Sequence, residues 1–303
     1  MNWAIILAGG AGRRLRPLTR QLTGDDRPKQ YCSLFGGSTL LAATRARVGR
    51  SVAPHRTLCL VTRAHQRYYR DALADLDSGL LIEQPCDRGT AAAIAYGTAR
   101  IHGMDPDAIV GFFPADHYYA DPGRLHAAIV AAYDAARRHP AFVFLLGAEP
   151  DRAETDYGWI EPGEALVDTA DARAFTVARF WEKPLRPIAR ILLERRALWN
   201  TFVMVGHVNT FRALLLLAAP RLAHKFDPFD RSAESDASVA AEVYAALPAW
   251  DFSHDVVASR PGFFAVIPLA EVGWTDLGRP ERVTALARAT GVRFPRAVVR
   301  AAG

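Results

Sequence analysis

The sequence has few cysteines, no long hydrophobic run and no block of like charge. Its three cysteines, Cys32, Cys59 and Cys86, are far apart and form no C-x-x-C pair, which argues against a disulfide framework or a zinc site and indicates a reducing compartment. The longest apolar stretch, 213–220, is too short to span a bilayer, and no signal-peptide pattern is present. Charges of both signs are interspersed along 303 residues with a net charge of +5, so no nucleic-acid-binding tail is expected. We therefore expect a cytoplasmic protein with neither membrane nor nucleic acid as a partner.

Lysine is also scarce, although basic residues are not. Of 37 basic residues only three are lysines, namely Lys29, Lys183 and Lys225. A chain that uses arginine almost everywhere keeps lysine where a compact ammonium on a flexible stem is needed, as when a point charge must reach a phosphate. Lys225 has no motif around it, and we expect it at the surface.

The first half of the chain alternates short apolar runs with longer helical patterns. Strands are predicted at 3–8, 57–61, 80–83, 109–113 and 141–146, and helices at 39–48, 65–76, 90–102 and 122–138. This alternation indicates βαβ units and a Rossmann-like, doubly wound α/β fold with a mixed, mostly parallel sheet. Half of the residues are hydrophobic, which is enough for a sizeable core.

The rhythm changes after about residue 150. Strands are predicted near 174–181, 201–205 and 263–267, and helices near 186–196, 207–218, 235–247 and 280–289. Without a repeat or linker, we expect a single domain over 1–303, with a nucleotide-binding half at about 1–150 and a sugar-phosphate-binding half at about 151–303. The second half is expected to be built onto the edge of the first sheet.

The stretch LAGGAGRRLRPLT, residues 7–19, places three glycines and three arginines directly behind the first strand. The dinucleotide fingerprint G-x-G-x-x-G is not matched, because the third glycine is missing and Pro17 disfavours helix at Arg16. The Walker pattern is absent as well. A purely structural turn would explain the glycines but not the arginines. The remaining interpretation is a loop whose backbone amides wrap a polyphosphate while an arginine neutralises it.

This stretch, followed by RPKQY, resembles the signature of the sugar-phosphate nucleotidyltransferases, L-A-G-G-x-G-[ST]-R-L-x-P-L-[ST] with a downstream P-K-Q. Arg13 stands where the family has a small hydroxyl residue, and the segment before RPKQY is a few residues longer than usual. The resemblance runs through nearly the whole chain. It implies the nucleotide-diphospho-sugar transferase type of fold. We expect no C-terminal β-helix or isomerase domain like those of some relatives.

Later motifs resemble the mannose-1-phosphate guanylyltransferase branch of this family. They are IEQPCDRGTAAAIA, FFPADHYYAD, TDYGWIEPG, RFWEKP, LWNTFVMV and GWTDLGRPERV. The chain departs from the branch pattern at four positions, where Gly89 replaces Asn, Ala92 replaces Pro, and Thr201 and Phe202 replace Ser-Gly. These departures fall close to where the family binds base or sugar.

The resemblance implies that a sugar 1-phosphate attacks the α-phosphate of a nucleoside triphosphate and releases pyrophosphate. A phosphate monoester has a second pKa of about 6 and is already largely dianionic, so no general base is needed. Catalysis then consists of positioning and charge neutralisation. Two lone carboxylates from distant segments suit Mg²⁺, which also takes phosphate oxygens. His117 is expected to have a hydrogen-bonding role rather than to bind metal.

The residues implied for each role are as follows. The catalytic residues are Arg14, Lys29, Asp116 and Lys183; the nucleotide-binding residues are Leu7, Ala8, Gly9, Gly10, Gly12, Arg13, Glu83, Gly89 and Thr90; the sugar-phosphate-binding residues are Gly158, Glu182, Lys183 and Asn200; and the metal ligands are Asp116 and Asp276. Glu83 is a candidate reader of guanine N1–H and N2–H₂, with Gln84 as a rival. Whether Arg13 contacts phosphate is left open.

Three functions remain in view at this point. The first is guanylyl transfer from GTP to mannose 1-phosphate, giving GDP-mannose and pyrophosphate with Mg²⁺ as the cofactor. The second is a related pyrophosphorylase for UTP or dTTP with glucose 1-phosphate. The third is a catalytically silent, nucleotide-sensing subunit, against which the retention of Arg14, Lys29, Asp116 and Lys183 argues. The sequence leaves the oligomeric state open, a homo-oligomer included.

Overall fold

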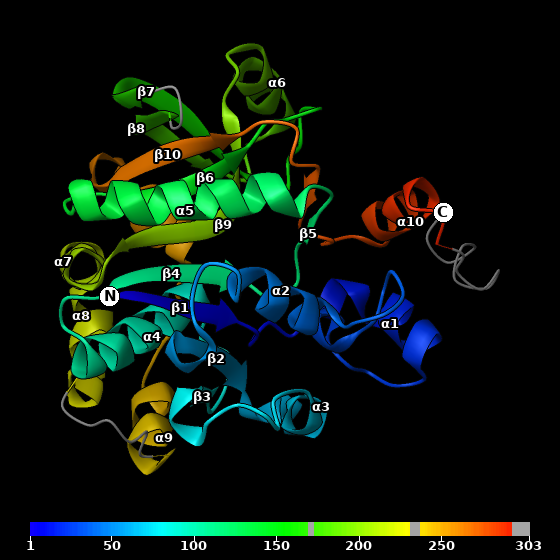
Figure 1. The fold of residues 1–303 in the computed structure, drawn as a ribbon, viewed down its shortest axis with the longest axis vertical. Coiled ribbons are helices and arrows are strands. Elements are labelled where there is room, and N and C mark those ends of the chain that lie inside the picture. The colour runs from blue at the N-terminus through cyan, green and yellow to red at the C-terminus, as the bar shows by residue number, and fades with distance from the viewer. Residues whose placement is uncertain (169–172, 231–236, 293–303) are drawn as a thin grey trace.

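The computed structural model describes residues 1–168, 173–230 and 237–292. A nine-stranded sheet has the strand order β3-β2-β1-β4-β9-β6-β10-β8-β7 (Figure 1). The strand bounds are β1 Asn2–Leu7, β2 Thr57–Thr62, β3 Leu81–Gln84, β4 Ile109–Pro114, β6 Val143–Ala148, β7 Gly158–Asp168, β8 Arg173–Glu182, β9 Leu198–His207 and β10 Phe264–Leu269. Strands β1 to β4, β6 and β10 run in one direction, and β9 runs against its neighbours β4 and β6. The predicted mixed, mostly parallel sheet is confirmed.

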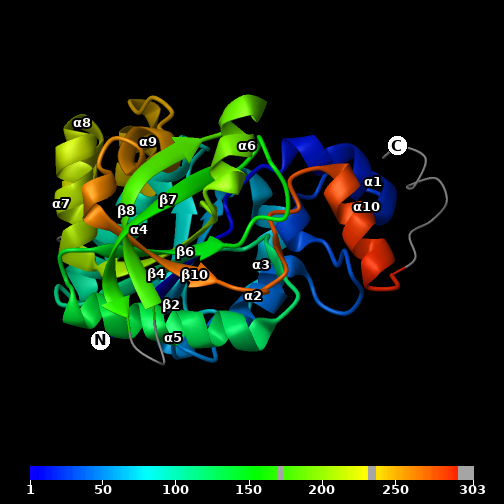
Figure 2. The same cartoon turned by 90° about the horizontal axis from the view of Figure 1, so that it is seen from above.

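Helices cover both faces of this sheet (Figure 2). Their bounds are α2 Leu40–Val48, α3 Gln66–Ala72, α4 Thr90–Met104, α5 Pro122–Arg138, α6 Arg186–Glu194, α7 Val208–Ala218, α8 Pro220–Ala223 and α9 Ala237–Ala245. Alternate residues of β1 serve two cores: Ile5 packs in the core under α4 and α7, and Ala4 and Ile6 pack in the core under α2 and α5. Continuous apolar strands are what a sheet covered on both faces requires. Of the helix predicted at 235–247, residues 235 and 236 lie outside the described residues.

The prediction that the second half adds to the edge of the first sheet holds for β10, β8 and β7, which extend the sheet beyond β6, but is wrong for β9. Strand β9 lies between β4 and β6, both of which belong to the first half of the chain, and β10 pairs with the other side of β6. The rhythm of elements along a chain gives their order but not their pairing partners. Because β9 is buried along nearly its whole length, it suits the centre of a sheet. Strand β7 was not predicted as a strand.

A second, two-stranded sheet ties two distant segments together at the carboxyl ends of the parallel strands. Strands β5 (Tyr118–Tyr119) and β11 (Trp274–Thr275) pair antiparallel, Tyr118 opposite Thr275 and Tyr119 opposite Trp274. The first follows β4 and the second follows β10. This pairing brings the residues just before β5 close to those just after β11, although more than 150 residues separate them in sequence.

A segment from the first part of the chain packs against the last described helix beside this small sheet. Helix α1 (Arg16–Thr23) and helix α10 (Pro280–Ala289) lie at the same end of the molecule (Figures 1 and 2). Leu15 and Leu18 share a small hydrophobic core with Leu277 and Val283. The expectation that Pro17 excludes helix at Arg16 is wrong, because Pro17 lies in the first turn of α1, where its missing N–H needs no partner.

Within the described ranges, the longest and most apolar helices still fall short of what crossing a membrane requires.

Candidate active site

A cavity of about 410 Å³, here called the main cavity, opens at the carboxyl ends of β1, β3 and β4. This is where open α/β sheets bind ligands. Ten of the residues named from the sequence line it: Leu7, Gly9, Gly10, Gly89, Thr90, Asp116, Gly158, Glu182, Asn200 and Asp276. The predicted nucleotide-binding and sugar-binding residues therefore border one continuous space.

A second cavity of about 310 Å³, here called the arginine cavity, adjoins the first. It is lined by Gly12, Arg13, Arg14, Leu15, Lys29, Asp116, His117, Asp276, Leu277 and Gly278. Asp116, His117 and Asp276 border both cavities. The two aspartates thus stand between a space lined by Arg13, Arg14 and Lys29 and a space whose other carboxylate-bearing lining residues are Asp87, Asp156, Glu182 and Asp251.

The glycine-rich turn after β1 is held in place by Gln30 of the P-K-Q motif. The side-chain amide Nε2 of Gln30 donates to the carbonyl oxygens of Ala8 and Gly10, both at 2.8 Å. A Cβ on Gly9 would lie 2.6 Å from Nε2 of Gln84 and 2.9 Å from Oγ1 of Thr62, so only glycine fits. Ala8 itself is buried and lines neither cavity, so its contribution here is through its backbone.

Glu83, predicted as the reader of the base, does not reach the main cavity. Glu83 accepts hydrogen bonds from Arg63, at 2.7 Å, and from the hydroxyl of Tyr69, and it lines neither cavity. Gln84, the rival, lines the main cavity and accepts a hydrogen bond from Tyr244 at 3.0 Å. Successive side chains of a strand point to opposite faces of the sheet. Gln84 therefore faces the main cavity, and the side chain of Glu83 lies on the other face of β3.

Gly89 is required by close packing of the backbone. Its φ is 84° and ψ 174°, a region that is essentially restricted to glycine. A Cβ there would lie 2.1 Å from the carbonyl oxygen of Trp250. That same oxygen accepts a hydrogen bond from the amide of Ala91, and the amide of Phe252 donates to Oγ1 of Thr90 at 2.8 Å. The segment 250–253 therefore docks on the N-terminus of α4, and Asp251 and Ser253 reach the main cavity.

Lys29 contacts residues from both halves of the chain at the arginine cavity. Its side chain is nearly buried, and its Nζ lies 3.2 Å from Oδ2 of Asp116. The same ammonium donates to the backbone carbonyl oxygens of Asp276 and Leu277. Lys29 thus contacts both predicted metal ligands, Asp116 through its carboxylate and Asp276 through its backbone carbonyl.

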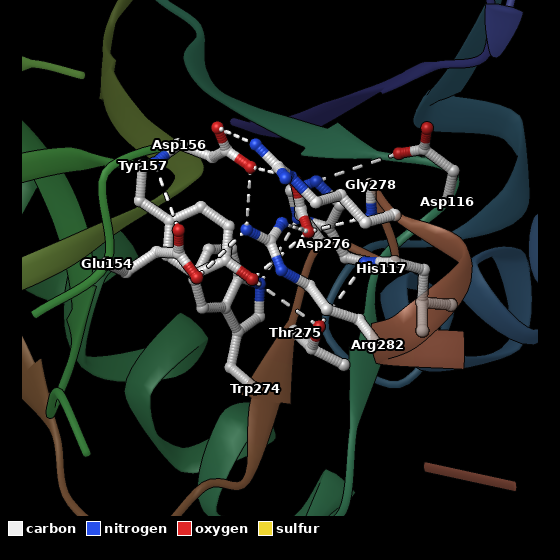
Figure 3. A network of polar contacts seen from close by, with 12 residues as sticks. Asp116, His117, Glu154, Asp156, Tyr157, Trp274, Thr275, Asp276, Gly278 and Arg282 are labelled. Carbon is white, nitrogen blue, oxygen red and sulfur yellow. Dashed lines mark hydrogen bonds and ion pairs between the residues drawn. The ribbon is translucent and has the colours of Figure 1, made fainter. Parts of the chain in front are cut away.

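Asp276 is the centre of a polar network that the sequence did not reveal (Figure 3). Its Oδ1 accepts hydrogen bonds from Arg282 Nη1 at 2.7 Å, from the amide of Gly278 at 2.8 Å and from the hydroxyl of Tyr157 at 3.1 Å. Burial raises the pKa of Asp276, but the charges of Lys29 and Arg282 lower it more, so the carboxyl is held below its usual range. Asp276 is therefore an anion at neutral pH.

Arg282 links Asp276 to the segment that precedes β7. Its Nη2 lies 2.9 Å from Oε2 of Glu154 and 3.1 Å from Oδ2 of Asp156, and its guanidinium lies 4.4 Å from the ring centre of Tyr157. Only about a tenth of the side chain is exposed. Asp156, Tyr157 and Trp274 also line the main cavity. Their place in TDYGWIEPG and GWTDLG was the available signal, whereas Asp251 and Ser253 lie in no motif.

His117 has the hydrogen-bonding environment expected of it. Its Nδ1 accepts a hydrogen bond from the indole N–H of Trp274 at 3.2 Å, and its Nε2 lies 3.7 Å from Oδ1 of Asp116. Burial lowers the pKa of His117, so the ring is neutral. An Nδ1 that accepts leaves the proton on Nε2, facing Asp116. Within the described residues, no three His, Cys, Asp or Glu side chains come together as a metal site.

The sugar side of the main cavity is formed by three of the predicted residues. A Cβ on Gly158 would lie 3.0 Å from Oε2 of Glu182 and 3.4 Å from Cβ of Asn200. Burial raises the pKa of Glu182. Lys183 lies at this rim with a φ of 47°, but its ammonium is paired with Glu182 and the residue lines neither cavity. Lys225 is exposed, as predicted.

Comparison with known proteins agrees with this geometry. Residues 3–290 match the family described as Nucleotidyl transferase, and the chain belongs to that family. It is 30% identical over 282 residues to a mannose-1-phosphate guanylyltransferase of Klebsiella pneumoniae, covering 90% of this chain and 57% of the relative. It is also 30% identical over 283 residues to xanthan biosynthesis protein XanB of Xanthomonas campestris, covering 90% of this chain and 57% of that protein. The chain thus spans somewhat more than half the length of these curated relatives.

Solved structures show the same fold. A structure described as mannose-1-phosphate geranyltransferase from Thermus thermophilus superposes with a TM-score of 0.81 at 30% identity, over 97% of this chain and 80% of that one. A putative glucose-1-phosphate thymidylyltransferase from Bacillus anthracis superposes with a TM-score of 0.57 at 15% identity, over 98% of this chain and 99% of that one. The second match supports the fold alone.

Proposed function

We propose that this protein transfers a guanylyl group from GTP to mannose 1-phosphate, giving GDP-mannose and pyrophosphate. The observation that carries the proposal is the meeting of Asp116, Asp276 and Lys29 at the junction of two cavities. One cavity is bordered by the glycine-rich turn and the predicted sugar residues, and the other by Arg13 and Arg14. The likeness to curated guanylyltransferases supports the choice of base and sugar.

The residues of the arginine cavity suit the triphosphate. Arg14 and Lys29 would neutralise its charge, and the amides of Gly9, Gly10 and Gly12 would approach its oxygens. Gly12 has a φ of 57°, and a Cβ there would lie 3.4 Å from the backbone nitrogen of Lys29. The turn is therefore narrow and lined by backbone, as a phosphate cradle must be. Arg13 lies beside Arg14 at the same cavity and is placed to contact phosphate too.

The sugar phosphate would be held on the opposite side. Glu182 and Asn200 would bond the sugar hydroxyls beside Gly158, and Lys183, at the rim, would reach the phosphate. An oxygen of the sugar phosphate forms a bond to the α-phosphorus while the bond to the β-phosphate oxygen breaks, and pyrophosphate leaves with the electron pair. No proton has to move, because the nucleophile is already dianionic. The protein's part is to align the two anions and neutralise them.

The residues present also fit a divalent cation. Asp116 and Asp276 both border the two cavities and supply carboxylate oxygens from distant segments. Among the described residues, no third His, Cys, Asp or Glu joins them in a group that could hold a metal ion. Mg²⁺ is characteristically held in this way, by one or two carboxylates plus substrate phosphates. When bound, it would neutralise charge on the triphosphate. Lys29 pairs with Asp116 and Arg282 pairs with Asp276, and both pairs would help to hold the ligands in place.

We propose further that the two halves of the chain act as one catalytic unit. The first half supplies Lys29 and Asp116, and the second supplies Gly158, Asn200 and Asp276 to the same cavities.

The test is a panel of triphosphates and sugar 1-phosphates assayed for pyrophosphate release with Mg²⁺. We expect GTP with mannose 1-phosphate to give the highest kcat/KM. A clear preference for UTP or dTTP would contradict the guanylyl assignment and favour the related pyrophosphorylase. No pyrophosphate release with any pair, from a protein that binds GTP, would favour the nucleotide-sensing subunit.

A further inference from the structure

Phe202 occupies a backbone conformation that a bulky side chain rarely adopts. Its φ is 61°, in the left-handed region that glycine enters without cost. A residue held in such a conformation is strained and persists only where the surrounding structure fixes it. Such outliers gather at binding sites. Phe202 lines the main cavity, so the outlier lies at the place where function is expected.

The strain has an identifiable source, a bulge in β9 opposite β6. Met204 pairs with Leu145 and Asn200 pairs with Gly147, so the three residues 201–203 of β9 stand opposite the single residue 146. The Thr201 hydroxyl fixes this bulge, because Oγ1 donates to the carbonyl oxygen of Leu146 at 2.7 Å and accepts from the amide of Val203 at 3.3 Å. Bulges beside active sites re-aim a side chain.

The bulge places the Phe202 ring at the sugar side of the cavity. The amide of Phe202 donates to Oδ1 of Asn200 at 3.0 Å, which ties the ring's backbone to a predicted sugar-binding residue. On the other side the ring meets Phe252 edge to face, with centroids 6.4 Å apart. Phe252 belongs to the segment that docks on Gly89 and Thr90. The ring is half-buried and so presents an apolar surface to the cavity.

We infer that Phe202 is a specificity-determining residue, whose ring forms an apolar wall that distinguishes between epimeric hexose 1-phosphates. A hexose that turns a C–H face to the ring keeps its hydroxyls for Glu182 and Asn200. An epimer that turns a hydroxyl to the ring must bury that hydroxyl without a partner, which is unfavourable. This inference takes the reaction from the proposed function, whereas the position of the ring in the main cavity is observed in the structure.

Matched variants distinguish an effect of the Phe202 ring on substrate choice from an effect of backbone strain on the fold. Phe202→Gly removes the wall and the strain together, and Phe202→Leu keeps an apolar side chain without the planar face. Arg196→Gly is the control for strain alone, because Arg196 also has a positive φ, of 56°, but is exposed and lines neither cavity. Each variant is first checked for cooperative thermal unfolding.

The experiment measures kcat/KM for mannose 1-phosphate and glucose 1-phosphate with GTP. Apolar walls discriminate between such substrates by a factor of about 10 to 100. We expect Phe202→Gly to reduce the ratio of the two kcat/KM values about 10-fold, mainly through KM for the sugar phosphate, with KM for GTP unchanged. Phe202→Leu should give an intermediate ratio, and Arg196→Gly should keep the wild-type ratio.

Each other outcome has a definite meaning. A wild-type ratio in both Phe202 variants would overturn the inference and leave the proposed function standing. If the wild type turns over neither sugar, the ratio of dissociation constants for the two sugar phosphates is measured by tryptophan fluorescence, since Trp274 lines the cavity. An unchanged ratio in that measurement would overturn the inference. Failure of the wild type to bind either sugar would overturn the inference and the proposed function together.

Discussion

Arg282, in the first turn of the last described helix, α10, donates a hydrogen bond to the carboxylate of Asp276 at 2.7 Å. The same guanidinium meets Glu154 and Asp156, so three carboxylates converge on one cation (Figure 3). Arg282 is not in contact with the predicted triphosphate side of the site. It acts through Asp276 and through Tyr157, whose hydroxyl binds the same carboxylate oxygen. We regard it as a positioning residue.

Replacing Arg282 with alanine should destabilise the fold. The side chains of Arg282, Glu154, Asp156 and Asp276 are each at most about a fifth exposed, and removal of one partner leaves charges that water solvates poorly. We expect a loss of about 3 kcal/mol in the free energy of unfolding. Urea denaturation at pH 7 measures it. Arg288→Ala, on an exposed position of the same helix, is the control and should change stability by less than about 0.5 kcal/mol.

The effect of Arg282→Ala should depend on pH in a definite direction. The pKa of Asp156 is lowered by its hydrogen bond from Arg279 and by the charge of Arg282; that of Glu154 is raised by burial but lowered more by backbone hydrogen bonds and by Arg282. A carboxyl with a depressed pKa stabilises the fold above its unfolded pKa, and this stability is lost as pH falls through the folded value.

The difference between wild type and Arg282→Ala should therefore be full above pH 4.5, the ordinary pKa of glutamate, and should shrink below pH 3.8, that of aspartate. Denaturation curves at a series of pH values test this. A difference that stays constant down to pH 3 would show that Arg282 stabilises by packing alone.

Lys29→Gln should impair the reaction far more than it impairs folding. The glutamine is one bond shorter than lysine, but it keeps an N–H donor on the side that faces the Asp276 and Leu277 carbonyls and removes the charge. Loss of one preorganised charge-stabilising group lowers kcat by a factor of about 100 to 1,000. Steady-state pyrophosphate release measures this, with Lys225→Gln as the control because Lys225 is exposed. Equal activities in the two variants would remove Lys29 from the catalytic role.

Gly89→Ala should destabilise the protein strongly. The backbone there has a φ of 84°, and the added Cβ would lie 2.1 Å from the carbonyl oxygen of Trp250. Either the alanine keeps this strained backbone conformation and its Cβ clashes with Trp250, or the segment 250–253 moves away from α4. We expect a loss of at least about 3 kcal/mol and a weaker affinity for GTP. In Gly262→Ala nothing lies within 4 Å of the new Cβ, so that variant should unfold like the wild type.

Asp116→Asn should abolish Mg²⁺-dependent turnover while the protein remains folded. The amide keeps the shape of the side chain but loses the charge that faces Lys29 at 3.2 Å. We expect kcat to fall at least about 1,000-fold. Asp134→Asn, an exposed position that pairs with Arg137 on α5, is the control. Undiminished turnover in Asp116→Asn would exclude that residue from the mechanism.

The sequence predicted the fold well where local signals suffice. Helices at 122–138 and 280–289 are found at the predicted residues, because Pro begins each and the apolar spacing is regular. The insertion of β9 between β4 and β6 could not be predicted, because pairing is decided by tertiary contacts. Glu83 shows the same limit at the scale of one residue, since a strand's facing depends on a register that the sequence leaves open.

The candidate site also has a part that the sequence predicted and a part that only the structure reveals. Its glycine-rich turn and its two aspartates stand in motifs, and the structure brings them together through the pairing of β5 with β11. Arg282 and its partners come from two distant segments, in or next to the motifs GWTDLGRPERV and TDYGWIEPG, and only the folded chain shows that they meet. Phe202 was visible as a departure from a motif, but its bulge and its positive φ were not.

The most direct test of the account is a crystal structure of the protein with GTP and Mn²⁺ in place of Mg²⁺. The anomalous scattering of Mn²⁺ locates the metal independently of the nucleotide. We predict one peak between the carboxylates of Asp116 and Asp276, with the triphosphate along the turn at Gly9, Gly10 and Gly12. A peak away from either aspartate, or a triphosphate bound elsewhere than this turn, would contradict the central claim.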